Sequence, residues 1–163
     1  MSTPPYLNIR AKVEDAVKGY IAASSIPGAI AVYNALECLA NDSVATMPFI
    51  LVHCPSSAPW VPEANANIAG VHARTVSCQI DVVTQSADVI VNNVTQQSGR
   101  DFHSNVVGTI LDYMLAGDAV AQLMAQNIDG LNVQDVALES ESISAGDMKY
   151  ETTLMFTING GPI

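Results

Sequence analysis

Hydrophobic positions recur along the chain with two different periods, which predict helices and strands. Residues 8–23 carry apolar side chains at steps of three and four, typical of a helix with one buried face. Its polar side is expected to comprise Lys12, Glu14, Asp15 and Lys18. A second helical stripe begins near residue 101, consists of Phe102, Val106, Val107, Ile110, Leu111, Met114 and Leu115, and predicts a long helix. Gly117-Asp118 is expected to end this helix and to start a shorter one that reaches residue 124 or 126.

Alternation of apolar and polar residues predicts strands. It is clearest in residues 72–84 and 150–158. The apolar sets are Val76, Cys78, Ile80 and Val82 in the first, and Tyr150, Thr152, Leu154, Phe156 and Ile158 in the second. Residues 47–54 are apolar at both alternations, which predicts a central strand covered on both faces. Shorter strands are expected within 29–37 and 133–140, and the latter is expected to pair with the terminal strand as an antiparallel hairpin.

Stretches rich in proline or polar residues separate these elements. We interpret residues 55–70 as a long loop, 92–99 as a polar connection and 160–163 as a tail. Helices and strands are segregated along the chain instead of alternating regularly, which is typical of an α+β fold. We therefore expect one domain over 1–163, with its core at 8–159. Its mostly antiparallel sheet of about four to five strands is expected to pack against the N-terminal helix and a long central helix pair.

Charge is scarce and almost all of one sign. Only 13% of the residues are charged, against about 25% in an ordinary soluble domain. Sixteen acids and six bases give a net charge of −10, and nine of those acids lie after residue 100. A hydrophobic content of 49% excludes disorder. So few charges on a folded chain suggest that other protein covers much of the surface, and the scattered bases exclude a basic patch for nucleic acid.

The sequence contains no recognisable catalytic, cofactor-binding or metal-binding pattern. His53 and Cys54 are neighbours, but adjacent residues of a strand point to opposite faces. His72, Asp101 and His103 lack a partner at the helical spacing typical of metal ligands. We therefore predict that the protein is not an enzyme and has no cofactor or metal.

The remaining sequence features concern the compartment. No apolar run reaches about 18 residues, the length needed to cross a bilayer. Residues 1–10 also lack the pattern of a secretion signal. Cys38, Cys54 and Cys78 are widely spaced and odd in number, so we predict small buried hydrophobes in a reducing compartment.

Two groups of residues are candidates for contacts with other molecules. The first is a set of acids near the last predicted hairpin: Asp135, Glu139, Glu141 and Asp147. They form either a solvated face or an acidic surface that lines a channel or meets a basic partner. The second is Trp60 with Val61 and Pro62 in the proline-rich loop. Trp60 either packs against the core of its own domain or anchors a neighbouring subunit.

The order of several segments resembles that of a known family. Ile26-Pro27-Gly28 follows the N-terminal helix, and Met47-Pro48-Phe49 opens the next strong strand. The strand at 74–82 then leads through Gly99-Arg100-Asp101 into the long helix, and 150–158 ends the pattern. Over residues 8–159 the chain resembles the tail terminator, or tail completion, proteins of long-tailed bacteriophages.

The resemblance implies a non-enzymatic virion protein, assembled in the host cytoplasm and located at the tail-neck junction. Such proteins form a hexameric ring that caps the tail tube, with the tail-tube protein on one side and the head-completion protein on the other. Six copies would carry a net charge of about −60. The four acids would then line a lumen that repels phosphate, so that double-stranded DNA passes without specific binding.

Two other interpretations remain open. The chain is alternatively another neck, connector or tail-tube subunit. From a different class, it is a non-viral α+β ligand-binding domain that dimerises, which predicts a concave pocket with convergent polar groups.

Overall fold

A five-stranded sheet forms the centre of the molecule. The computed structural model describes residues 5–27, 30–34, 47–59, 74–126, 128 and 131–162. The strands of the sheet are β1 (Ala31–Asn34), β2 (Phe49–Pro59), β3 (Arg74–Gln85), β6 (Leu131–Gly146) and β7 (Lys149–Pro162). Their order is β1-β2-β3-β7-β6, with β1 and β2 parallel and the other neighbours antiparallel. This confirms the predicted α+β class and its mostly antiparallel sheet.

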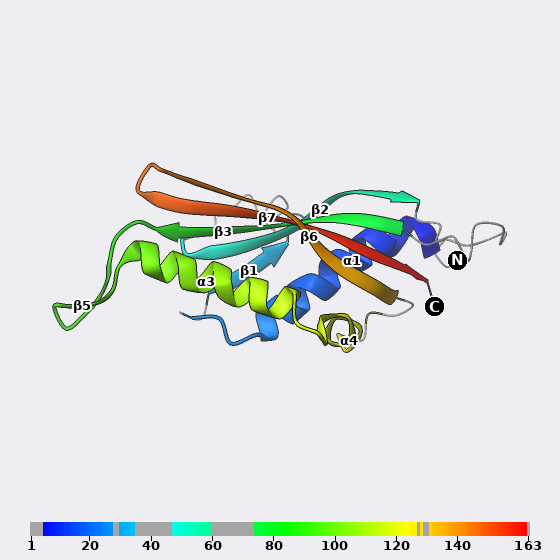
Figure 1. Cartoon of the computed structure of the whole chain (residues 1–163), viewed down its shortest axis with the longest axis horizontal. Coiled ribbons are helices and arrows are strands. Elements are labelled where there is room, and N and C mark those ends of the chain that lie inside the picture. The colour runs from blue at the N-terminus through cyan, green and yellow to red at the C-terminus, as the bar shows by residue number, and fades with distance from the viewer. Residues whose placement is uncertain are drawn as a thin grey trace.

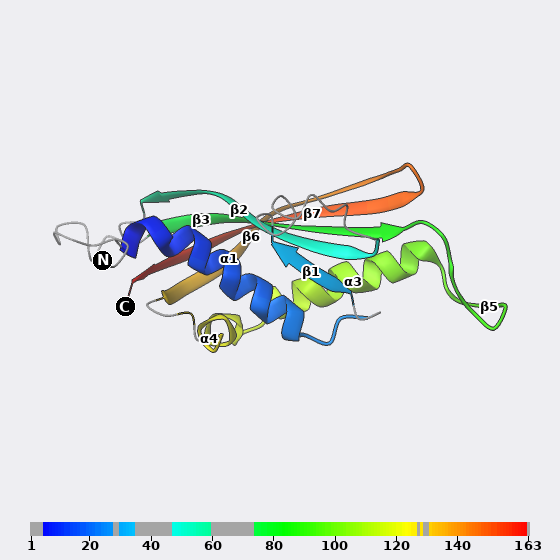
Figure 2. The ribbon, with the colours of Figure 1, turned by 180° about the vertical axis from the view of Figure 1, so that it is seen from behind.

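The helices lie on a single face of the sheet. They are α1 (Pro5–Ala23), α3 (Gly99–Met114) and α4 (Ala119–Met124). Figures 1 and 2 show all three on the same side. Among the elements that the structure describes, none covers the opposite side, which we call the open face. The described elements thus form two layers, one of strands and one of helices.

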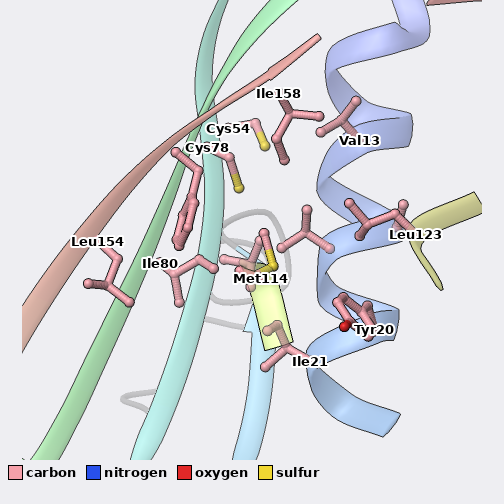
Figure 3. Packing of buried hydrophobic residues seen from close by; sticks show 14 of the residues in the cluster. Val13, Tyr20, Ile21, Cys54, Cys78, Ile80, Met114, Leu123, Leu154 and Ile158 are labelled. Carbon is pink, nitrogen blue, oxygen red and sulfur yellow. The ribbon is translucent and has the colours of Figure 1, made fainter. Parts of the chain in front are cut away.

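The core lies between the helices and the sheet, and it follows the alternation in the sequence. Both apolar sets predicted for the two clearest strands point toward the helices. The residues fully buried there are Val76, Cys78, Ile80 and Val82 of β3 and Leu154, Phe156 and Ile158 of β7. Figure 3 shows α1 contributing Val13 and Ile21 to the same layer. Because a slip of one residue would move these side chains to the open face, burial fixes the register of β3 and β7.

Helix α3 begins where the sequence predicts, and local contacts explain why. The Ser98 side chain accepts a hydrogen bond from the Asp101 backbone N–H at 3.0 Å, which caps the helix. Asp101 also places a negative charge in the first turn, where the helix dipole favours it. A Cβ on Gly99 would lie only 2.3 Å from the carbonyl oxygen of Ser86, so glycine permits this close approach to the segment after β3.

Strand β2 corrects the predicted loop at 55–70. Residues 55–59 continue the strand, because a bulge between His53 and Ser56 accommodates Pro55 before pairing with β3 resumes. The remainder of that segment, including Trp60, Val61 and Pro62, lies outside the described residues. As predicted, β2 is an inner strand, but only alternate residues of its first half are buried, so the prediction of cover on both faces was wrong.

A small hairpin replaces most of the polar connection predicted after β3. It consists of β4 (Val89–Val91) and β5 (Val94–Gln97), joined through Asn92 and Asn93. Both asparagines have positive φ, 52° and 62°. This is the backbone of a type I′ turn, which asparagine tolerates better than most residues.

The terminal hairpin is longer than the sequence predicts. β6 and β7 turn through Asp147 and Met148, both with positive φ, and β6 continues to Gly146, well beyond its predicted end at residue 140. At the other end, Gly160 and Gly161 pair with β6 and do not form a free tail. A Cβ on Gly160 would lie 3.0 Å from the carbonyl oxygen of Asn132, which shows how closely the two backbones approach.

Candidate assembly surface

The open face of the sheet carries polar side chains that bind one another. The register of β3 and β7 places Asp81 opposite Thr153 and Gln79 opposite Met155. Thr153 Oγ1 donates to Asp81 Oδ1 at 2.7 Å, and Gln79 Nε2 donates to the two Asp81 oxygens at 3.1 and 2.9 Å. The Asp81 carboxylate is therefore held in one position by donors from two strands.

A second set of hydrogen bonds crosses three strands near the other end of this face. Thr75 Oγ1 of β3 donates to Asn159 Oδ1 of β7, and Asn159 Nδ2 donates to Asp135 Oδ1 of β6, both at 2.7 Å. Thr157 Oγ1 donates to the Glu139 carboxylate. These bonds restrict side-chain rotation before any partner binds, which lowers the entropy cost of using this face as a contact surface.

The four acids predicted as one surface separate into three positions. Asp135 and Glu139 lie on the open face, together with Asp81, which the sequence analysis did not single out. Glu141 pairs with Leu154, whose side chain is buried under the helices, so Glu141 points to the helix side of β6. Asp147 lies in the turn between β6 and β7. The alternation of residues 75–81 was the signal that would have placed Asp81 on this face.

Strand β6 forms an exposed edge of the sheet. Among the described strands it pairs with β7 alone, and its residues from 139 to 146 are exposed. Two large apolar side chains project near its end: Ile143 is 67% exposed and Met148, in the turn, is 80% exposed. Unpaired backbone groups beside exposed apolar side chains are a template for contact with another chain.

A groove lies between α1, α3 and α4 and has a volume of about 390 Å³. Its walls include Tyr20, Tyr113 and Asp118. The two rings meet edge to face with centroids 5.7 Å apart, and Tyr20 Oη donates to the Tyr113 carbonyl at 2.8 Å. Burial, and secondarily the nearby Asp118 charge, raises the pKa of Tyr20. The Tyr20 hydroxyl therefore serves to hold α1 against α3.

His103 is bound by two threonines of the sheet. Its Nδ1 lies 2.8 Å from Thr84 Oγ1 and its Nε2 lies 2.7 Å from Thr152 Oγ1. The residue is only 2% exposed, and burial lowers the pKa of the imidazole. Among the described residues, no three His, Cys, Asp or Glu side chains gather as a metal site would require. His72 lies outside them.

The lowered pKa of His103 predicts a pH-dependent stability. In the unfolded chain the imidazole has a pKa of about 6.5. The stabilisation from the neutral, buried imidazole is therefore complete above that pH, and it is lost as the pH falls toward the lower pKa of the folded state. We expect the free energy of unfolding, measured with urea between pH 7 and 5, to fall more steeply for the wild type than for His103→Gln. Equal slopes for the two proteins would contradict this assignment.

One buried acid was assigned to the wrong side of its helix by the sequence pattern. Glu14 was predicted on the polar side of α1, yet it is 2% exposed. Its Oε2 accepts a hydrogen bond from the Cys54 backbone N–H at 2.9 Å, and Arg10 Nη1 donates to the Cys54 carbonyl at 2.8 Å. Since the pairing of β2 with β3 skips Cys54 and Pro55, α1 supplies the hydrogen bonds of the bulge.

Comparison with known proteins adds a match in fold. The sequence matches no protein-family model and no curated protein. The structure resembles a chain of a solved structure described as the virion of a native gene transfer agent (GTA) particle, with a TM-score of 0.65. The two chains are 11% identical, and the match covers 94% of this chain and 97% of that chain. The likeness therefore extends over the whole fold, including both the sheet and its helices.

One further finding concerns membranes. Within the described residues, no helix combines the length and apolar character needed to span a bilayer.

Proposed function

We propose that this protein is a structural virion component that forms a ring at the end of a tail tube and joins the tail to the head. The observation that carries the proposal is the fold match, which covers almost all of both this chain and a chain of a virion particle. The order of elements resembling tail terminator proteins supports the more specific role. In this proposal the chain has no catalytic activity.

The geometry suggests how such a ring is built. The exposed edge of β6, with Ile143 and Met148, contacts the neighbouring copy and removes these apolar side chains from water. The open face, with Asp81, Asp135 and Glu139, turns toward the lumen. Because these carboxylates repel phosphate, double-stranded DNA passes without being retained. The tail-tube protein and the head-completion protein contact the two rims.

The test is the size and shape of the purified assembly. We expect light scattering to give a discrete species of six copies, each of 17.2 kDa, and negative-stain microscopy to show six-fold rings. Ile143→Lys is expected to yield monomers, because a charged side chain at the contact must be desolvated. Ile143 is 67% exposed in the single chain, so the melting temperature of the monomer should not change.

Other outcomes separate the alternatives. Long tubes would indicate a tail-tube subunit and would contradict the capping role. A stable dimer with a small molecule bound beside Tyr20 and Tyr113 would favour a ligand-binding domain, for which the groove provides the pocket.

A further inference from the structure

Two cysteine side chains meet inside the core at the bulge of β2. Cys54 of β2 and Cys78 of β3 are both fully buried and both free thiols. The register pairs His53 with Gln79 and Ser56 with Ser77, so Cys78 lies opposite the bulged Cys54. Figure 3 shows both side chains on the helix side of the sheet, where the strand register makes them neighbours. The predicted burial is confirmed for these two residues, and Cys38 lies outside the described residues.

The backbone geometry suits a covalent bond between these sulfurs. Regularly paired residues of antiparallel strands have Cα atoms about 4.5–5.5 Å apart, within the range of about 4.4–6.8 Å found for disulfides, and Cys54 and Cys78 directly follow the regular pair His53–Gln79. Both side chains already point to the helix side of the sheet, where both are fully buried. Little movement of β2 or β3 is therefore needed to join them.

We propose that Cys54 and Cys78 form a redox-modification site, which is a dithiol inside the cell and becomes an intramolecular disulfide in an oxidising environment. This inference goes beyond the proposed function, and only its timing rests on that function, since a virion protein leaves the reducing cytoplasm when particles are released. The bond would lock β2 to β3 at the one point where their backbone pairing is interrupted.

Hydrogen peroxide is a sufficient oxidant for this reaction. One thiol sulfur attacks a peroxide oxygen, the O–O bond breaks, and a sulfenic acid and one water form. The second sulfur then attacks the sulfenic sulfur and displaces a second water. The two thiols lose two electrons and two protons in total, and both oxygens of the peroxide leave as water.

The surroundings make this reaction slow. Interaction with the Cys78 thiol, burial and the nearby Glu14 carboxylate all raise the pKa of the Cys54 thiol, so the reactive thiolate is scarce. Arg10 and Glu14 also hold the backbone of the bulge from α1. Oxidant therefore reaches the thiols only when β2 opens locally. This protects the dithiol during a brief exposure to oxidant and favours slow conversion to the disulfide outside the cell.

The experiment uses the full-length chain with Cys38→Ser, which leaves two thiols. After incubation with hydrogen peroxide, thiols are alkylated under denaturing conditions and peptides are mapped by mass spectrometry. We expect both thiols to be lost together in one peptide pair joining Cys54 to Cys78, reversed by dithiothreitol. The melting temperature should rise by roughly 5–10 °C, because the bond closes a loop of about 25 residues in the unfolded chain.

The control is Cys38→Ser combined with Cys78→Ala, which should show no cross-link and no rise in melting temperature after the same treatment. Persistence of two alkylatable thiols, oxidation of each sulfur separately to the sulfinic acid, or only intermolecular dimers would overturn the proposal. If the control does not fold, the peptide map of the two-thiol protein still shows whether Cys54 and Cys78 are joined. If the protein forms the cross-link but no rings, the proposed function is wrong and the disulfide proposal is unaffected. If it forms rings but no cross-link, only the disulfide proposal is wrong.

Discussion

Replacement of Phe156 by alanine is expected to lower the free energy of unfolding by about 3–5 kcal/mol. Among the described residues, Phe156 has the largest fully buried side chain, and it lies on β7 between Cys78 of β3 and Leu138 of β6. The sheet is paired on both sides at this point, so its backbone cannot collapse to fill the space that the ring leaves. The measurement is urea unfolding, in which the midpoint should fall without a change in slope.

The neighbouring residue provides the matched control for this prediction. Met155 is adjacent on β7 but points to the open face and is only half-buried. Met155→Ala is expected to cost less than about 1.5 kcal/mol, because its side chain already contacts water. Equal losses for the two variants would contradict the two-layer arrangement, in which the described helices all cover the face that carries Phe156.

The parts of the fold that depend on local patterns were predictable from the sequence. The stripe of α3 and the alternation of β3 and β7 each repeat over enough residues to indicate both the element and its buried face. The hairpin of β4 and β5 had a readable signal too, since Asn92-Asn93 lies between two valine-containing segments. It was missed because the surrounding polar residues were interpreted as a connection.

The parts that depend on irregular pairing were not predictable. The bulge between Leu138 and Ser140 shifts the alternation of β6, so Glu139 and Glu141 point to opposite faces although they are two residues apart. The acids on the open face come from separate strands and share that face only through strand pairing. The extension of β2 through Pro55 likewise depends on α1, because Arg10 and Glu14 supply the hydrogen bonds that β3 does not.

Glu14→Ala is therefore expected to cost about 2–3 kcal/mol of unfolding free energy, unusually much for an acid on a helix. The Cys54 N–H would be left buried without an acceptor, and Arg10, whose Nη1 lies 3.5 Å from Glu14, would lose its ion pair. Asp15→Ala is the control: this neighbouring acid is exposed, and its replacement should change the free energy by less than about 0.5 kcal/mol. Urea unfolding of the three proteins at one pH makes the comparison.

Glu14→Gln distinguishes the two possible causes of such a loss. An amide oxygen still accepts a hydrogen bond from the Cys54 N–H, but it carries no charge for Arg10. If the hydrogen bond at the bulge dominates, Glu14→Gln retains most of the wild-type stability. Arg10 is 36% exposed and has the Cys54 carbonyl as a second acceptor, so the loss of the ion pair alone should cost less than about 1 kcal/mol. A glutamine variant as unstable as the alanine variant would show instead that the charge holds α1 to β2.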